Sequence, residues 1–187
     1  MNGRLELQPT RIAGLTLIKR KPLGDARGFL ERLYCATELR AAGLTKSIRQ
    51  INRTFTQRRG TVRGLHFQHA PAMETKIVSC LRGRVFDVAV DLRAGSATFL
   101  DWFGIELSAD NGQTLMIPEG FAHGLQTLED DCEMLYLHTE DYAAHAEGGL
   151  SALDPRIAIA WPLAITEMST RDQTLPTLDH GFTGLAP

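Results

Sequence analysis

The sequence predicts an all-β fold, a barrel or sandwich of short strands forming one domain over residues 1–187. Three observations carry this prediction. Short apolar runs recur at close spacing between turn residues such as glycine, proline, asparagine and aspartate, which is typical of barrels and sandwiches. Only one segment has the pattern of a full helix. A length of 187 residues suits a single core, and no linker or repeat divides the chain.

The N-terminal part is expected to contain two strands and the one helix. Residues 12–19 and 29–34 are apolar runs on either side of a turn-forming stretch at residues 24–28, so a strand is expected on each side. Residues 37–42 combine a possible cap at Thr37 with good helix formers, and Gly43 follows them, which predicts a short helix.

Strand patterns dominate the middle of the chain. Residues 76–81 and 85–92 are apolar runs joined by three residues that include Gly83, a spacing that predicts a β-hairpin. On the second run Asp87 and Asp91 share one face, which is either a functional surface or a solvated edge. Further strands are expected at residues 48–56, 60–66, 98–107, 114–117, 124–128 and 132–138. Beyond them an irregular C-terminal segment with one helical turn is expected.

Charge and cysteine content exclude several functions. With 20 basic and 22 acidic residues, the chain has no general attraction for nucleic acid or an anionic membrane. No apolar stretch is long enough to span a bilayer, and no secretion signal begins the sequence. Cys35, Cys80 and Cys132 are odd in number and widely spaced, which indicates reduced thiols in a cytoplasmic protein.

Residues 50–76 concentrate polar side chains in a stretch with few aliphatic ones. Within it Arg63 and His66 stand three residues apart, so on a regular strand they would face opposite ways. If both serve one pocket, Gly64 between them must bend the strand.

Two spaced motifs resemble those of the cupin superfamily. Gly60 and His66 match the start of its first motif, and the stretch from Gly112 to His123 matches the second. In metal-binding cupins the first motif continues with a second histidine and a glutamate, whose side chains converge on one ion. Here Gln68 stands in place of that histidine. The resemblance implies a cupin-type β-jelly-roll barrel with short peripheral helices and a dismantled metal site, and it implies no cofactor.

A longer ordered set of motifs resembles one family within the cupins. The set comprises DARGF (25–29), QINRTFT (50–56), GTVRGLHFQ (60–68), FDVAVDLRAGS (86–96), IPEGFAHG (117–124) and STRD (169–172). In this order and spacing they resemble the dTDP-4-dehydrorhamnose 3,5-epimerases, metal-free enzymes that epimerise 4-keto sugar nucleotides. The resemblance extends over nearly the whole chain.

The family resemblance implies catalytic roles for four residues. His66 would be the general base, oriented by the carboxylate of Asp172. Lys76 would lie beside the sugar ketone, and Tyr136 would be the general acid. The chemistry is consistent, because an enolate oxygen needs a nearby positive charge and inversion needs a proton returned from the opposite face. Each residue alone has an ordinary structural interpretation, and only their combination favours function.

The same resemblance implies a set of binding residues. Arg27 and Arg63 would meet the diphosphate, Gln50 and Asn52 the nucleotide, and Tyr142 the sugar. A supporting place in the pocket is expected for His123. The other histidines are interpreted as structural: His69, His138, His145 and His180.

Glu31 marks a departure from the family. In the family the strand carrying this glutamate is exchanged between subunits and helps contact the nucleobase, which implies a homodimer. Here Glu31 stands one residue closer to the Arg27-Gly28 pair, a shift that reverses its facing side unless a bulge is lost. Thymidine is the default base, and cytidine, uridine and guanosine remain open.

We therefore expect epimerisation at C3, C5 or both of a nucleotide-linked 4-keto-6-deoxy sugar, of the dTDP-4-dehydro-6-deoxyglucose type. A mono-epimerase or 3,4-ketoisomerase acting on another sugar nucleotide is the nearest alternative. A metal-dependent cupin oxygenase or isomerase would instead use His66, His69, Glu74 and His123 as ligands. A non-catalytic sugar-nucleotide binder is a third possibility.

Overall fold

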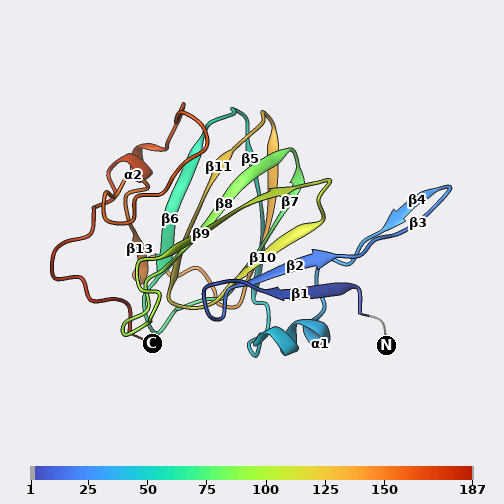
Figure 1. Ribbon diagram of the computed structural model, residues 1–187, viewed down its shortest axis with the longest axis horizontal. Coiled ribbons are helices and arrows are strands. Elements are labelled where there is room, and N and C mark those ends of the chain that lie inside the picture. Colours follow the sequence, from blue (N-terminus) through green and yellow to red (C-terminus); the bar gives the residue numbers. More distant parts are fainter. Residues whose placement is uncertain (1–2, 187) are drawn as a thin grey trace.

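Two antiparallel β-sheets face each other and form the body of the protein, a computed structural model that describes residues 3–186 (Figure 1). One sheet has six strands, in the order β1 (Leu5–Pro9), β2 (Thr16–Arg20), β10 (Gln113–Ile117), β7 (Lys76–Arg82), β12 (Cys132–His138) and β5 (Gln50–Thr56). The other has five, in the order β13 (Glu147–Gly149), β6 (Val62–Gln68), β11 (Phe121–Thr127), β8 (Arg84–Asp91) and β9 (Trp102–Ser108). The predicted all-β class is confirmed.

A separate two-stranded hairpin projects from this body (Figure 1). It consists of β3 (Leu23–Asp25) and β4 (Gly28–Leu30), which pair only with each other. The strand predicted at residues 29–34 is therefore wrong beyond Leu30, because residues 31–35 have no strand partner among the described residues. In the following sections we call β3, β4 and their turn the arm.

The predicted hairpin between residues 76–81 and 85–92 is wrong. Both stretches are strands, β7 and β8, but they lie in opposite sheets and do not pair. Gly83 joins them with a φ of 73°, and a Cβ there would lie only 2.8 Å from Cys132 Sγ. The chain crosses from one sheet to the other at this glycine, so a tight turn here encloses the core instead of extending one sheet.

Other differences concern strand ends. Residues 12–15 form a turn before β2 instead of a strand, because buried Ile12 and Leu15 point into the core from that turn. Residues 98–101 likewise form turns before β9. Strand β1 was not predicted, since its sequence LELQP offers little apolar alternation and ends in proline.

Helical structure is short. Helix α1 (Ala36–Leu39) continues as a 3₁₀ turn, η1 (Arg40–Ala42), and ends at Gly43 in the left-handed region, which confirms the predicted helix. The predicted cap is wrong, because Thr37 lies inside the helix. Helix α2 (Thr170–Gln173) is the single turn expected near the C-terminus. No helix within residues 3–186 is long and apolar enough to cross a bilayer.

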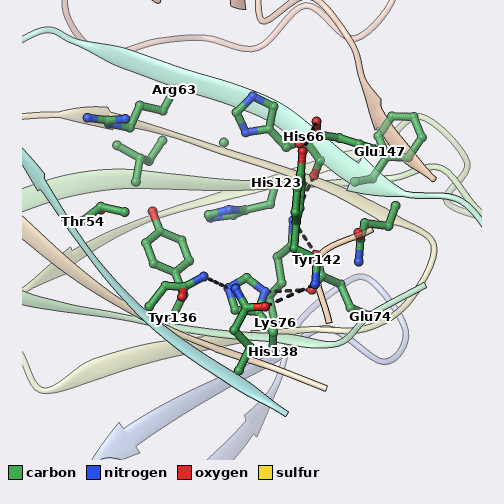
Figure 2. Close-up of a pocket in the computed structure, with 16 residues that line it drawn as sticks. Thr54, Arg63, His66, Glu74, Lys76, His123, Tyr136, His138, Tyr142 and Glu147 are labelled. Atoms are coloured by element: carbon green, nitrogen blue, oxygen red, sulfur yellow. Dashed lines mark hydrogen bonds and ion pairs between the residues drawn. The ribbon is translucent and has the colours of Figure 1, made fainter. Parts of the chain in front are cut away.

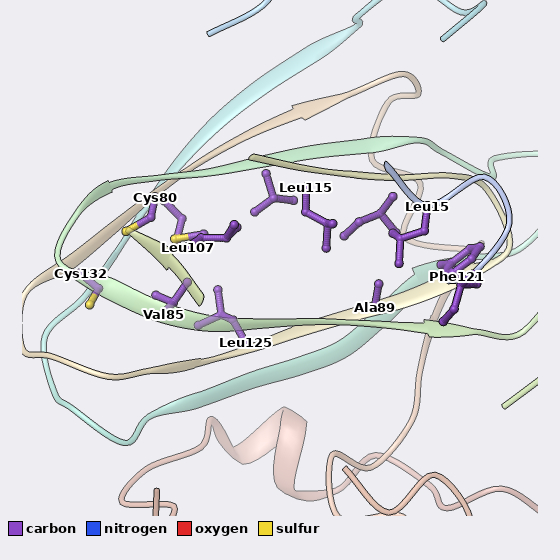
Figure 3. Close-up of a cluster of buried hydrophobic side chains, with 13 residues drawn as sticks. Leu15, Cys80, Val85, Ala89, Leu107, Leu115, Phe121, Leu125 and Cys132 are labelled. Carbon is purple, nitrogen blue, oxygen red and sulfur yellow. The ribbon is translucent and has the colours of Figure 1, made fainter. Parts of the chain in front are cut away.

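Apolar side chains fill the space between the sheets from Cys80 and Cys132 to Leu15 and Phe121 (Figure 3). Val85 and Ala89 of β8 point into this core, while Phe86, Val88 and Val90 point outward under the C-terminal segment. Cys80 and Cys132 are buried in the core as free thiols, and burial raises the pKa of Cys80 to about 12. Polar side chains of β5, β6, β7, β11 and β12 meet beside this core.

Candidate active site

A cavity of about 300 Å³ opens between the two sheets, away from the apolar core (Figure 2). One wall comes from β5, β7 and β12 of the six-stranded sheet, and we call it the donor wall. The other comes from β6 and β11 of the five-stranded sheet, and we call it the imidazole wall. Most of the predicted site residues line the cavity: Gln50, Asn52, Arg63, His66, Lys76, His123, Tyr136 and Tyr142.

A β-bulge turns Arg63 and His66 to the same side of β6. The register pairs His66 with His123 and Arg63 with Leu125, so two residues of β6 stand opposite one residue of β11. Gly64 in the bulge has a φ of 107°, a region that favours glycine. The predicted bend at Gly64 is confirmed.

His66 is hydrogen-bonded to Asp172, which belongs to α2. Its Nε2 lies 2.7 Å from Asp172 Oδ1, while Asp172 Oδ2 accepts the Gly64 N–H at 3.1 Å. Burial alone would raise the pKa of Asp172, but the hydrogen bond and charge of His66 and the Gly64 N–H lower it below its usual value. A charged carboxylate on Nε2 fixes the ring and leaves Nδ1 to accept a proton. About a third of the His66 side chain is exposed, so the ring is accessible from the cavity.

Tyr136 lies on the opposite wall (Figure 2). Its ring meets the His123 ring edge-on at 5.9 Å between centroids and stacks on His138 at 6.1 Å. Burial, and next the negative charge of Asp87, raise the pKa of Tyr136 well above its usual value. The phenol therefore keeps its proton at neutral pH.

Lys76 begins β7 on the same wall as Tyr136. Its ammonium lies 3.2 Å from the backbone oxygen of His66 and 3.4 Å from Glu74 Oε1. The side chain is 11% exposed, so its charge acts in a largely dehydrated space. A positive charge is thus held in the same cavity as the His66 ring and the Tyr136 phenol.

His123 has its own carboxylate partner. Its Nε2 lies 2.9 Å from Asp87 Oδ2, and both side chains are buried. Asp87 thus faces the interior and is not the solvated edge acid that the sequence left possible. Asp91 is also buried, but it binds Arg93, Ser96 and Thr98 away from the cavity.

Arg63 and Tyr142 lie at the rim of the cavity. The guanidinium of Arg63 donates to Thr56 Oγ1 at 2.8 Å and to the Phe55 oxygen at 3.2 Å, which leaves part of it facing outward. The backbone N–H of Tyr142 donates to Gln50 Oε1 at 3.2 Å, and the hydroxyl of Tyr142 donates to Glu147 Oε2 at 3.0 Å.

Two predicted binding residues lie outside this cavity. Arg27 is at the tip of the arm, where it pairs with Asp25 and is almost fully exposed. Glu31 lies 3.3 Å from Arg20, a buried arginine of β2. The chain by itself therefore does not bring Arg27 and Glu31 to the other site residues.

The metal-dependent alternative finds no support in the side chains. Within residues 3–186 no group of three or more histidine, cysteine, aspartate or glutamate side chains is arranged to hold an ion. Gln68, at the position of the second cupin histidine, uses its amide to bind the backbone of Ala72, Asp141 and Ala143. The Gln68 side chain therefore joins the backbone at residue 72 to the backbone at residues 141–143, beside the cavity.

Sequence reasoning missed His138 as a cavity residue and named Glu74 only as a ligand in the metal-dependent alternative. His138 Nδ1 lies 2.8 Å from Glu74 Oε2, and both side chains line the cavity. The signal was present, because His138 is two residues after Tyr136 and strand residues two apart share a face. The same spacing separates Glu74 from Lys76.

Fold and site together define a cupin-like jelly-roll protein whose cavity is equipped for proton transfer. The family profile described as dTDP-4-dehydrorhamnose 3,5-epimerase matches residues 9–180. A relative of that name from Sinorhizobium fredii is 41% identical over 172 residues, which cover 91% of this chain and 88% of the relative. The chain belongs to the dTDP-4-dehydrorhamnose 3,5-epimerase family, as the sequence predicted, and is a sugar-nucleotide epimerase.

Solved structures agree with this assignment. The crystal structure of dTDP-6-deoxy-D-glucose-3,5-epimerase from Legionella pneumophila, in complex with dTDP-4-keto-L-rhamnose, is 36% identical with a TM-score of 0.91, and the match covers 98% of this chain and 99% of that one. A 3′-monoepimerase from Streptomyces bikiniensis, in complex with dTDP-quinovose, is 30% identical with a TM-score of 0.83, and the match covers 90% of this chain and 86% of that one. The predicted jelly roll is confirmed by these neighbours.

Proposed function

We propose that this epimerase inverts C3, C5 or both carbons of a nucleotide-linked 4-keto-6-deoxy sugar, with His66 as general base and Tyr136 as general acid. One observation carries the proposal: the His66–Asp172 pair and the Tyr136 phenol belong to opposite walls of one cavity. A sugar ring bound between the walls has one face toward the imidazole and the other toward the phenol.

The first step is removal of the proton from a carbon next to the C4 ketone. His66 takes this proton, and the electrons of the C–H bond form a C=C bond while the ketone oxygen becomes an enolate. The ammonium of Lys76 stabilises the negative charge on that oxygen. Asp172 stabilises the imidazolium that forms on His66.

The second step returns a proton to the same carbon from the other face. Tyr136 donates its phenolic proton, the C=C electrons form the new C–H bond, and the ketone is restored with inverted configuration. The step leaves a phenolate and an imidazolium, and proton exchange with water returns both residues to their starting forms. The substrate gains and loses one proton at each inverted carbon, so the reaction is redox-neutral.

The rim of the cavity fits the charged part of the substrate. The outward part of the Arg63 guanidinium suits a diphosphate, because its planar fork matches phosphate oxygens. Gln50 and Asn52 follow on β5 with their amides toward the cavity, where they are able to bind the nucleotide. This division leaves the sugar in the inner part, between His66 and Tyr136.

The number of inverted carbons separates this function from its nearest alternative. A 3′-monoepimerase shares the fold with 30% identity, so the fold alone accommodates single inversion. Incubation with dTDP-, CDP-, UDP- and GDP-linked 4-keto-6-deoxyhexoses in deuterium oxide distinguishes the cases. Proton NMR reports which ring hydrogens wash out and which nucleotide is accepted.

The His66→Ala variant tests the proposed base. We expect the washout of the C3 or C5 hydrogen into deuterium oxide to fall by about 10³-fold or more, because a positioned base contributes on the order of 10²–10⁴. His180→Ala is the matched control, since His180 is exposed and does not line the cavity. Wild-type washout in His66→Ala would exclude the assignment. Absence of washout in the wild-type protein with every sugar nucleotide tested would instead favour the non-catalytic binder.

We further propose a homodimer in which the arm of one chain completes the site of its partner. The arm projects from the body, and Leu23, Phe29 and Leu30 on it are 50–74% exposed. An isolated hairpin with exposed apolar side chains is marginally stable in water. On the six-stranded sheet Ile51 and Phe55 also point outward and are at least half exposed. An arm crossing to a partner would cover both surfaces and carry Arg27 toward the partner's cavity.

Solution mass measurements test the dimer, and the Phe29→Asp variant tests the role of the arm in it. A wild-type protein that sediments as a monomer at micromolar concentration would contradict the proposal.

The three free cysteines are consistent with a reducing cytoplasmic location. Cell fractionation checks that location, and recovery outside the cytoplasm would contradict it.

A further inference from the structure

Three cavity side chains form a cluster in which only Lys76 has a part in the proposed reaction. Glu74, Lys76 and His138 lie side by side on the donor wall (Figure 2). Their side chains are only 9%, 11% and 14% exposed. His138 of β12 is the direct register partner of Lys76 on β7. A buried glutamate and a buried imidazole beside a catalytic ammonium require an explanation.

The Glu74 carboxylate is shared unequally by its two neighbours. Its Oε2 lies 2.8 Å from His138 Nδ1, a normal length for a hydrogen bond to a charged group, whereas its Oε1 lies 3.4 Å from Lys76 Nζ. The imidazole makes the shorter contact with the carboxylate, and the ammonium forms a looser ion pair with it. Glu74 thus balances the charge of Lys76 through the longer of its two contacts.

This spacing leaves Lys76 able to bind a substrate oxygen. An ammonium has three N–H donors, and the hydrogen bond of Lys76 to the His66 backbone oxygen, at 3.2 Å, uses one of them. A carboxylate drawn fully onto the ammonium would hold another donor firmly and compete with an enolate oxygen for the same charge. The shorter hydrogen bond to His138 keeps the ion pair between Glu74 and Lys76 at the longer distance of 3.4 Å.

The groups around His138 hold its ring in one orientation. Asn52 Nδ2 lies 3.5 Å from His138 Nε2, and the Tyr136 ring stacks on the imidazole with 16° between the planes. Burial alone would raise the pKa of Glu74, but the His138 hydrogen bond and the Lys76 charge lower it below its usual value. The glutamate therefore stays negative at neutral pH.

We propose that Glu74 and His138 are a positioning pair for Lys76, in which His138 Nδ1 anchors the glutamate so that the ammonium stays charge-balanced but free to bind the enolate oxygen. This inference rests on the proposed role of Lys76 in the reaction. Neither residue of the pair touches the reacting carbon. Both act through the position of the lysine.

Three substitutions of His138 separate the two ring nitrogens. Asparagine places an amide N–H near the position of Nδ1, glutamine places one near Nε2, and alanine removes both. We expect His138→Asn to keep kcat within about threefold of wild type, and His138→Ala and His138→Gln to lose about tenfold or more. The KM should change less than twofold in all three, because Lys76 acts on the enolate and not on the bound ground state. Equal losses in all three variants would overturn the proposal, as would rescue by glutamine alone.

A Lys76→Met background shows whether the pair acts through the lysine. We expect Lys76→Met to lower the washout of ring hydrogens by about 10²-fold, which prolonged incubation in deuterium oxide still measures. In that background His138→Ala and Glu74→Gln should each change the washout less than twofold. A further tenfold loss would mean that the pair acts on the fold or on the substrate, and it would overturn the proposal.

The same variants distinguish a failure of this inference from a failure of the proposed function. Full washout activity in Lys76→Met would exclude a role for the lysine in the mechanism, and it would also exclude the proposed role of the Glu74–His138 pair. A large loss in Lys76→Met together with an independent loss in His138→Ala would retain the lysine and reject only the pair. Thermal unfolding midpoints within about 3 °C of wild type show that each variant is folded.

Discussion

The two walls of the cavity carry different chemistry, although both are sheets of the same jelly roll. The imidazole wall presents His66 and His123, each bonded to a buried carboxylate, Asp172 and Asp87. The donor wall presents the phenol of Tyr136, the ammonium of Lys76 and the amides of β5. The proposed general base, His66, therefore lies on one sheet and the proposed general acid, Tyr136, on the other.

This difference explains why two facing sheets suit an epimerase. Inversion requires that a proton leave from one face of a planar intermediate and return on the other. The two walls of a jelly roll lie on opposite sides of the cavity, so the fold itself separates the proposed base from the proposed acid. The remaining requirement is that each wall hold its groups in place, and the carboxylates behind the imidazoles and the rings packed against Tyr136 do this.

Among the variants that test this difference between the two walls, Tyr136→Phe is expected to have the largest effect. This variant removes the donor and leaves the imidazole wall intact. We expect the formation of inverted product to fall by about 10²–10³-fold, while hydrogen washout falls much less, because His66 still removes a proton and returns deuterium to the same face. NMR of the product in deuterium oxide measures both quantities in one sample. Parallel loss of washout and inversion would break the assignment of donor and acceptor to separate walls.

A smaller effect is expected from Gly64→Ala, which tests how the imidazole wall is built. A Cβ at this residue would lie 2.6 Å from the His123 oxygen and 2.8 Å from Gly124 Cα, at a φ of 107°. We expect a loss of about 3 kcal/mol in the free energy of unfolding, from crowding and from the unfavourable backbone. Activity should fall as well, since the bulge aims both Arg63 and His66.

Gly95→Ala is the matched control for Gly64→Ala. Gly95 also has a positive φ, 72°, but nothing lies within 4 Å of a Cβ there. It should lose about 1 kcal/mol from the backbone alone. Urea unfolding measures the free energy of unfolding of both variants. Equal losses in Gly64→Ala and Gly95→Ala would mean that the close approach of β6 and β11 is not what requires glycine at residue 64.

The two walls also differ in how far the sequence predicted them. On the imidazole wall His66 and His123 stand in the two cupin-like motifs, and a bend at Gly64 was predicted on the condition that Arg63 and His66 serve one pocket. On the donor wall Tyr136 and Lys76 were selected only by the family resemblance. His138 was interpreted as structural because an isolated histidine usually is.

Long-range arrangement limited the prediction of the fold. Residues 76–92 have the local pattern of a hairpin, and nothing local tells a turn within one sheet from a crossing between two. The close approach of Gly83 to Cys132, on a distant strand, appears only in the folded chain. The arm was predicted only in part. The Glu31 contact joins Arg20 of β2 to the segment after β4, a pairing that the local pattern does not show.

The smallest effect concerns the carboxylate behind His66 and is read from stability instead of activity. The folded pKa of Asp172 is lowered by His66 and the Gly64 N–H despite burial, so the folded protein binds this proton less tightly than the unfolded chain. Its contribution to stability is therefore complete above the unfolded pKa of about 4 and is lost as pH falls through the folded pKa. Relative to Asp172→Asn, wild type should be more stable by on the order of 1 kcal/mol at pH 6, and this advantage should shrink below pH of about 4. Urea unfolding at several pH values measures it, with the exposed turn residue Asp110→Asn as control. An advantage that does not change with pH would mean that Asp172 contributes packing and not charge, and the imidazole wall would then lack the ionic support that distinguishes it from the donor wall.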